Sequence, residues 1–479
     1  MSKEVHLMWD DSVLTIAPSS DKLEKFLTYR EKKLVQDPKV PWKRVTKVTV
    51  NPLYKVVSQQ NGYKVIQTMQ GMWLKVKTFL EEQGWDIKFY DMRISFPKPR
   101  LDLMCGFRFK QEELLNSFLK AGCSGLLGAP TRYGKTTLIK NTLRAFPNVH
   151  TVVTAPGADL VKQLYEDVKE ALPHREVKLI GAGSTKSPCD DINVVSMDSL
   201  HKCDASSCKL LLIDEPHACV TDSRLPELTK FDKARRIGFG ATLKGRFDQR
   251  DILIEALIGP VIAERTFQQA VAEGAVCPLI VYMVVIPLAG TCDDRDRAYK
   301  THLFKGERVA KAVRWICHDL LPKDWQTLIF IKNEDQAEYF LDWVGQTGTI
   351  AMAKRLTKTE RENLMERMRD DEVKRCLASE IYAQGVTFNH VRALINLSGG
   401  GANTSTIQKP GRLAEVRPDK KCGVVFDFFF TPGTGRGNGV QALYRESLAR
   451  VKAYTEKGYE IIYVDSYNAL EESFKSKAV

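Results

Sequence analysis

From about residue 100 onward, short apolar strands alternate with helical stretches along the chain. Strands that alternate with helices in this way pair in parallel, because each helix carries the chain back across the sheet in a right-handed crossover. Ligands of such sheets bind at the carboxyl ends of the strands. The predicted strands are 125–128, 150–155, 192–196, 210–214 and 236–239, and later 327–331, 375–379, 393–397 and 423–426. The interval between the two sets predicts two α/β lobes, residues 100–280 and 281–479.

Residues 1–99 follow a different pattern. They contain short alternating stretches, such as 47–50 and 63–66, and two helical segments, 21–34 and 71–83. Pro97-Lys98-Pro99 would end this part as a linker. The sequence therefore predicts a small α+β module before the two lobes, since 479 residues are too many for one comfortable core.

The charge of the chain favours a polyanionic partner. It has 71 Lys and Arg against 59 Asp and Glu, a formal net charge of +12, which suits DNA or RNA. Its 11 cysteines are scattered without the spacing of a zinc site, as in a reduced cytoplasmic protein. No apolar run of about 18 residues occurs, and the N-terminus lacks a charged segment leading into an apolar one. We therefore expect a cytoplasmic protein with no membrane partner.

A candidate phosphate loop lies between a predicted strand and a predicted helix. In that setting, successive backbone N–H groups and the start of the helix can face an anion. Lys135 would contact the β- and γ-phosphates, and the Thr136 hydroxyl would hold Mg²⁺. A plain strand-turn-helix connection is the alternative, since Ala129 replaces the first glycine of the generic pattern. The predicted nucleotide-binding residues are Ala129, Pro130, Thr131, Arg132, Tyr133, Gly134, Lys135, Thr136 and Thr137.

Two carboxylates end the apolar strand 210–214. Asp214 and Glu215 at the end of a buried strand are suited to hold the Mg²⁺ shell and to polarise an attacking water. A surface turn with two solvated acids is the alternative. Together with the loop at Lys135, however, the pair predicts the catalytic centre of an enzyme that hydrolyses ATP with Mg²⁺.

The ordered motifs over roughly residues 105–465 resemble those of superfamily 2 helicases of the DExH type. Asp214-Glu-Pro-His217 resembles the DExH box, and the family's loop commonly begins with Ala-Pro-Thr, as here. The resemblance implies two RecA-like parallel-sheet lobes and a Gln, here Gln111, that reads the adenine edge. It implies coupling of the ATP site to strand binding through His217, Gly240, Ala241 and Thr242. It also implies nucleic-acid contacts at Thr154, Pro156 and Gln163.

The second lobe continues the resemblance. The segment around Gln384 and Gly385 resembles motif V, which would contact nucleic acid. Gln408-Lys-Pro-Gly-Arg412 resembles motif VI, whose Gln408 and Arg412 would serve catalysis, with Arg412 reaching the γ-phosphate from the opposite lobe. The family's second arginine is replaced by Glu415, and Arg417 is the nearest substitute.

Within the superfamily, the layout resembles phage recombination and branch-migration helicases of the UvsW type. That resemblance implies a DNA helicase or translocase acting on single-stranded or branched DNA, in recombination and repair. It would be a monomer or weakly associating protein, in the host cytoplasm if encoded by a phage. RNA remains a possible partner. The alternatives are an RNA helicase of the same superfamily and a nucleic-acid clamp that uses ATP only as a switch.

The N-terminal module mixes aromatic and basic residues. Interleaved aromatics and cations can stack on bases and neutralise phosphates. Equally, the aromatics can form the core of the module while the lysines are solvated. The residues concerned are Trp9, Trp42, Tyr54, Tyr63, Trp73 and Trp85, with Lys32, Lys33, Lys39, Lys43, Arg44, Lys47 and Lys55.

Overall fold

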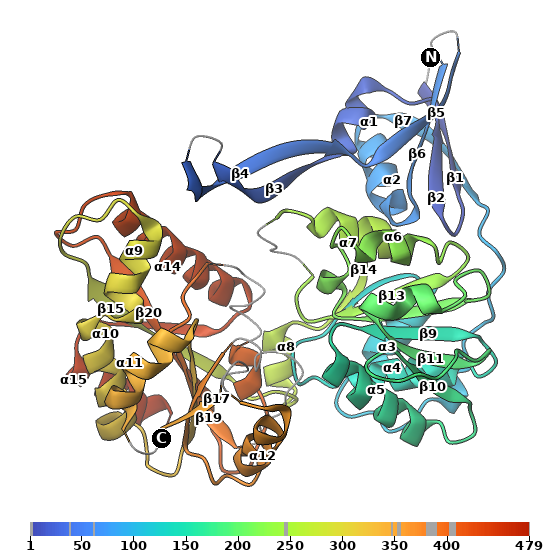
Figure 1. Cartoon of the computed structure of the whole chain (residues 1–479). Helices are drawn as coiled ribbons and strands as arrows, with labels where there is room; N and C mark the ends of the chain where they lie inside the picture. Colours follow the sequence, from blue (N-terminus) through green and yellow to red (C-terminus); the bar gives the residue numbers. More distant parts are fainter. Residues whose placement is uncertain are drawn as a thin grey trace. The chain divides into compact units, whose positions relative to one another are not determined.

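The computed structural model describes residues 3–37, 40–60, 63–243, 248–345, 348–351, 356–379, 390–401 and 409–478. The chain forms two compact units (Figure 1). The first comprises Met1–Pro130 and Gly134–Arg265, and the second comprises Thr131–Tyr133 and Thr266–Val479.

The N-terminal part of the first unit is a mixed α+β module. Its main sheet has the order β5-β6-β2-β1-β7, in which β1 and β7 pair in parallel and the other pairs are antiparallel. Val76 and Leu80 of α2 lie in one core with Val5 and Leu7 of β1. Strands β3 and β4 form a separate hairpin. The elements are β1 (Lys3–Trp9), β2 (Val13–Ala17), α1 (Asp21–Phe26), β3 (Thr28–Asp37), β4 (Val40–Pro52), β5 (Tyr54–Gln60), β6 (Tyr63–Met69), η1 (Gln70–Met72), α2 (Trp73–Glu82) and β7 (Trp85–Asp91).

The helix expected over 21–34 was wrong in its second half. Helix α1 ends at Phe26, and β3 begins at Thr28. Lys and Glu are good helix formers, which favoured a longer helix, but local propensity is a weak guide when a partner strand is present. Here β4 pairs with β3 along its length, from Pro52 opposite Thr28 to Val40 opposite Asp37.

Two of the module's tryptophans belong to its core. Trp9 is 6% exposed and stacks on Trp73 with 4.8 Å between ring centroids. The Arg93 guanidinium lies 3.5 Å from the centroid of the Trp9 ring. Tyr63, in contrast, is 50% exposed. The core interpretation therefore holds for Trp9 and Trp73, which are not free to stack on bases.

The remainder of the first unit is a parallel α/β lobe. Its sheet has the order β10-β11-β9-β12-β13-β8-β14. Every residue of β9, β11 and β12 is buried, as expected for strands covered by helices on both faces. The elements are η2 (Leu101–Leu103), α3 (Gln111–Lys120), β8 (Gly125–Gly128), α4 (Lys135–Ala145), β9 (Thr151–Ala155), α5 (Ala158–Ala171), β10 (Val177–Ile180), β11 (Ile192–Ser196), η3 (Met197–Lys202), β12 (Leu210–Asp214), η4 (Pro216–Ala218), α6 (Arg224–Thr229), β13 (Arg235–Gly240), α7 (Asp251–Ile258) and β14 (Val261–Glu264).

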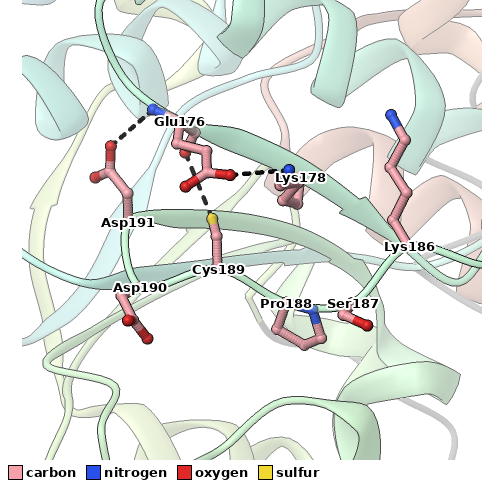
Figure 2. Close-up of a pocket in the computed structure, with 8 residues that line it drawn as sticks. All are labelled: Glu176, Lys178, Lys186, Ser187, Pro188, Cys189, Asp190 and Asp191. Atoms are coloured by element: carbon pink, nitrogen blue, oxygen red, sulfur yellow. Dashed lines mark hydrogen bonds and ion pairs between the residues drawn. The ribbon is translucent and has the colours of Figure 1, made fainter.

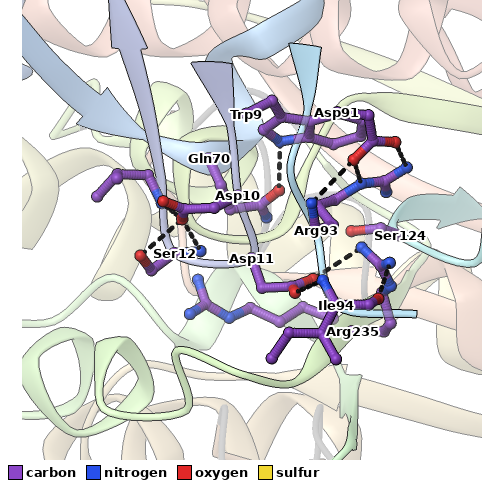
Figure 3. Close-up of polar contacts among 12 residues, drawn as sticks. Trp9, Asp10, Asp11, Ser12, Gln70, Asp91, Arg93, Ile94, Ser124 and Arg235 are labelled. Carbon is purple, nitrogen blue, oxygen red and sulfur yellow. Dashed lines mark hydrogen bonds and ion pairs between the residues drawn. The ribbon is translucent and has the colours of Figure 1, made fainter. Parts of the chain in front are cut away.

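The module and this lobe are joined by a buried polar contact (Figure 3). The Asp11 carboxylate lies 2.7 Å from the Arg235 guanidinium and accepts the Ile94 N–H at 2.7 Å. Gln70 donates to the carbonyl oxygens of Leu257 and Ile258, the last turn of α7. The apolar residues on the two sides form one continuous core. The module is therefore part of the first unit.

The second unit is another parallel α/β lobe. Its sheet has the order β17-β18-β16-β19-β20-β15-β21, with all pairs parallel. The elements are α8 (Phe267–Ala272), β15 (Leu279–Pro287), α9 (Arg295–Tyr299), η5 (Lys300–Phe304), α10 (Glu307–Trp315), η6 (Ile316–Leu320), β16 (Gln326–Phe330), α11 (Glu334–Val344), β17 (Gly348–Ala351), α12 (Lys358–Arg369), β18 (Arg375–Ala378), β19 (Val391–Asn396), η8 (Pro410–Leu413), β20 (Gly423–Thr431), α14 (Asn438–Glu456), β21 (Glu460–Val464) and α15 (Tyr467–Lys477).

The predicted fold class is confirmed: two RecA-like parallel-sheet lobes follow a small α+β module. Within the described ranges, none of the helices has the length and apolar character needed to cross a membrane.

Candidate functional site

The predicted phosphate loop connects β8 to the N-terminus of α4, as the sequence indicated. Gly134 caps the helix with a left-handed backbone, at φ 93°. Any other residue would be strained at this φ, and its Cβ would lie 2.5 Å from Gln111 Nε2, which would have to move. The first N–H groups of a helix lack partners inside the helix and can bind an anion. Lys135, the first residue of α4, and Thr136 are partly exposed at this point.

The two predicted acids follow at the carboxyl end of β12. Asp214 is the last residue of that strand and is 8% exposed. Lys135 Nζ lies 2.5 Å from Glu215 Oε1, and His217 Nδ1 lies 3.3 Å from Glu215 Oε2. The structure thus brings Lys135, Asp214, Glu215 and His217 together at one edge of the sheet.

The electrostatics of the two acids differ. Burial raises the pKa of the Asp214 carboxyl to about 6, and the Lys135 charge opposes part of the rise. Burial also acts to raise the pKa of Glu215, but the Lys135 cation and His217 outweigh it and hold that pKa well below its usual range. Glu215 is therefore ionised, and its carboxylate can accept a hydrogen bond from a water.

Gln111 lies beside the loop. It is the first residue of α3, is 1% exposed, and its Oε1 accepts the Arg108 N–H at 2.9 Å. Its Nε2 is the atom nearest to the position that a Cβ at Gly134 would take. A glutamine so close to the loop is well placed to bind the base of a nucleotide whose phosphates lie there, and that role stays a prediction.

The predicted coupling residues link the loop and the acids. Gly240 ends β13, and its carbonyl oxygen accepts the Ala129 N–H at 3.0 Å. The preceding carbonyl oxygen, that of Phe239, accepts the Glu215 N–H at 3.0 Å. Ala241 is partly exposed, and Thr242 is 3% exposed. A shift at the end of β13 would therefore displace both the phosphate loop at Ala129 and the segment at Glu215.

The predicted nucleic-acid-binding residues of this lobe differ in how exposed they are. Thr154 is fully buried in β9, and its hydroxyl donates to Val195 O at 2.9 Å. A phosphate contact at Thr154 would therefore have to come from its backbone, and that contact stays a prediction. Pro156 is partly exposed and Gln163 is exposed.

In the second unit, Arg412 lies on η8 and is partly exposed. The Arg417 guanidinium is held by Asp419 Oδ1 at 3.0 Å and by the His390 ring at 2.9 Å. These contacts hold the Arg417 side chain against residues of its own unit. Gln384, Gly385 and Gln408 lie outside the described residues.

A buried polar network that we did not predict supports η8. Lys409, 2% exposed, donates to Ser398 Oγ at 2.5 Å, and Ser398 in turn donates to Asn396 Oδ1 at 3.0 Å. Asn396 donates to Asp427 Oδ2, which also accepts from Arg450 Nε at 2.9 Å. The one signal in the sequence was an Asp inside the apolar strand 423–431, since buried acids need partners.

The described residues of the first unit offer few protein ligands for Mg²⁺. Among the described residues, no group of three or more His, Cys, Asp or Glu side chains forms a metal cage. Mg²⁺ is commonly held by one or two carboxylates plus phosphates and waters, so Asp214 with the Thr136 hydroxyl is a sufficient protein contribution.

A separate pocket lies at β10 and the loop before β11 (Figure 2). Its Glu176 and Lys178 side chains form an ion pair of 2.8 Å, and the Cys189 thiol contacts the Glu176 carbonyl oxygen. No residue of the phosphate loop lines it. This pocket is therefore separate from the residues at which we expect the nucleotide.

Two family descriptions match the chain. "Type III restriction enzyme, res subunit" matches residues 105–245, and "Helicase conserved C-terminal domain" matches residues 311–416. A protein named "Putative helicase 22", from Sulfolobus islandicus filamentous virus (isolate Iceland/Hveragerdi), is 19% identical over 426 residues, which are 78% of this chain and 72% of that protein.

Solved structures resemble the fold at low identity. S. cerevisiae Dbp5 bound to RNA and ADP BeF3 is 15% identical, with a TM-score of 0.51 over 76% of this chain and 92% of that chain. The Type ISP restriction-modification enzyme LlaBIII bound to DNA is 13% identical, with a TM-score of 0.55 over 78% of this chain and 32% of that chain. T4 UvsW is 15% identical and aligns over 97% of this chain and 99% of that chain, with a TM-score of 0.41.

Proposed function

Because this chain belongs to the superfamily 2 helicases and is an ATP-dependent enzyme, we propose that it is a DNA helicase or translocase that unwinds or branch-migrates forked and junction DNA. The functional division would be a module of residues 1–99, an ATP-binding lobe of 100–280 and a second lobe of 281–479. The observation that carries the proposal is the approach of Lys135 to Glu215 beside a glycine-capped helix N-terminus.

Each residue of this group has a proposed role. A bound phosphate would compete with Glu215 for the Lys135 ammonium, because both are anions within its reach. Binding of ATP would thereby release the Glu215 carboxylate to orient the attacking water and accept its proton. Asp214 and Thr136 would hold Mg²⁺, which when bound neutralises charge on the phosphates.

The second lobe would supply Arg412. A cation that reaches the transferred phosphoryl group stabilises the charge developing on it. The buried Lys409 network would keep η8 in place while Arg412 remains partly exposed. Gln408, Gln384 and Gly385 would complete the catalytic and nucleic-acid contacts of this lobe.

Two alternatives remain to be separated from DNA unwinding. An RNA helicase would use the same ATP site, and Dbp5 was solved with RNA whereas LlaBIII was solved with DNA. A clamp that uses ATP only as a switch would not need a carboxylate kept ionised beside the phosphate loop. The position of the Glu215 carboxylate, 2.5 Å from Lys135 Nζ beside the phosphate loop, therefore favours hydrolysis over a passive switch.

The test is ATP hydrolysis measured in parallel without polymer and with single-stranded DNA, duplex DNA, forked DNA and RNA. We expect DNA, above all forked DNA, to stimulate turnover. Glu215→Gln should bind ATP but hydrolyse it about 10²-fold more slowly or worse, because Gln cannot accept the proton. Stimulation by RNA alone would establish the RNA helicase. Equal turnover of Glu215→Gln and the parent would remove Glu215 from the mechanism.

A further inference from the structure

The hairpin β3–β4 stands apart from the main sheet of the module. Among the described residues its two strands form a sheet of their own, and Figure 1 shows them extending away from the main sheet. The register runs from Thr28 opposite Pro52 through Lys33 opposite Lys47. Residues directly opposite each other in an antiparallel pair have their side chains on the same face, and neighbours along a strand alternate between faces. The hairpin therefore has two distinct faces.

The face with odd-numbered residues anchors the hairpin on the first lobe. Glu31 is 7% exposed and accepts from Asn51 Nδ2 at 3.1 Å. Arg250 Nη1 lies 3.7 Å from Glu31 Oε1 and 2.7 Å from Asp222 Oδ1. Lys33 Nζ lies 3.2 Å from Glu31 Oε1. The backbone adds a bond from the Lys32 N–H to Asp248 O.

These anchors follow the ATP motifs closely along the chain. Asp222 comes after the DExH segment that ends at His217, and Arg250 comes after Thr242. The pairs that involve Asp222 are largely solvent-exposed and add little stability, since its side chain is 71% exposed. The pair of Arg250 and Glu31 is the stronger attachment. Their side chains are buried, with exposed fractions of 11% for Arg250 and 9% for Glu31.

The face with even-numbered residues is open. Val48 is 51% exposed and Val50 is 64% exposed. Lys32 lies opposite Val48, and Arg30 lies opposite Val50. Over 28–34 and 46–52, this face carries no acidic residue, whereas the anchoring face carries Glu31. Cations beside exposed apolar side chains suit nucleic acid, where cations contact phosphates and apolar groups pack on sugars or unstacked bases.

We propose that the face formed by Arg30, Lys32, Val48 and Val50 is a contact surface for double-stranded nucleic acid, which the anchored hairpin holds fixed on the first lobe. This rests on the proposed function, since a motor on nucleic acid brings a duplex to the protein. A protein partner of mixed charge is the less suited occupant, because over 28–34 and 46–52 no acidic residue accompanies the cations of this face.

The test compares two double charge reversals in the full chain. Arg30→Glu/Lys32→Glu changes the proposed face. Lys47→Glu/Lys55→Glu makes the same change in net charge on exposed lysines of the same module, on the anchoring face and on β5. Affinity for blunt duplex DNA and duplex RNA is measured by fluorescence anisotropy over a range of salt. ATP turnover with single-stranded DNA is measured alongside.

We expect Arg30→Glu/Lys32→Glu to weaken duplex binding by about 10-fold or more and to lower the salt slope by about 2, one for each lost phosphate contact. Lys47→Glu/Lys55→Glu should change affinity by less than about 3-fold, with turnover on single-stranded DNA retained in both variants. Val48→Ser/Val50→Ser should impair fork unwinding while the salt slope is kept.

Equal weakening by both charge reversals, or none by Arg30→Glu/Lys32→Glu, would overturn the proposal. Thermal unfolding of each variant at the parental temperature is the control for correct folding. The proposed function is tested by a different assay, ATP turnover. It would be contradicted if no nucleic acid changed the ATP turnover of the parent protein.

Discussion

The joint between the module and the first lobe gives the most direct prediction of stability. The Asp11 and Arg235 side chains are only 7% and 9% exposed, and their charged groups are 2.7 Å apart. Asp11→Ala would leave the Arg235 guanidinium buried, with the Ile94 carbonyl oxygen at 2.9 Å as a remaining acceptor. Breaking a buried ion pair in this way costs about 3–5 kcal/mol. Because one acceptor remains, we expect a loss of about 3 kcal/mol in the free energy of unfolding.

A double substitution distinguishes charge from packing. Burial raises the pKa of the Asp11 carboxyl even though Arg235 is adjacent, so desolvation outweighs the attraction of the pair. Replacing both groups with apolar side chains of similar size then removes the desolvation together with the attraction. Asp11→Leu/Arg235→Met should therefore unfold within about 1 kcal/mol of the parent.

Urea unfolding followed by tryptophan fluorescence is the assay. Trp9 and Trp73 lie in the module core and report its unfolding. Asp86→Ala is the matched control, since Asp86 pairs with Lys88 at the surface, and it should cost no more than about 0.5 kcal/mol. A loss below about 1 kcal/mol for Asp11→Ala would refute the reasoning, as would a module that unfolds in a separate earlier transition.

Three further substitutions address the ATP site. Lys135→Ala should reduce ATP turnover by about 10²-fold or more while leaving ATP-independent DNA binding intact, and near-parental hydrolysis in the folded variant would exclude the phosphate loop. Arg412→Ala should reduce turnover by about 10³-fold. Arg417→Ala should reduce it by less than about 10-fold, because Asp419 and His390 hold that side chain, and the reverse ranking would move the catalytic arginine to Arg417.

The parts of the fold that follow from local pattern were predictable. Strands such as β9 and β12 are continuous apolar runs, and α5 begins close behind β9, so parallel pairing follows from the sequence. The position of Lys135 at a helix N-terminus and of Asp214 at a strand end also follows from local pattern. These two places meet because the carboxyl ends of parallel strands share one edge of the sheet.

What the sequence did not predict depends on long-range pairing. Residues 28–34 have helical composition and become a strand because residues 46–52 pair with them. The Thr154 hydroxyl could not be known to face Val195 O. Lys409 and Asp427 are members of one network only because β19 and β20 are neighbours. Local propensity contains no information on such partners.

The shared core of the first unit bears on how the hairpin acts. Deleting residues 1–99 would uncover apolar residues of α7 such as Ile254 and Leu257, which pack in one cluster with the module. A Cβ at Gly71 would lie 2.0 Å from Glu255 O, so the module backbone is in close contact with the same helix. Loss of activity after such a deletion would therefore report instability as much as lost recognition. Because the hairpin is anchored near Asp222 and Arg250 on that same rigid unit, any ATP-driven displacement of the first lobe carries the face of Arg30 and Lys32 with it.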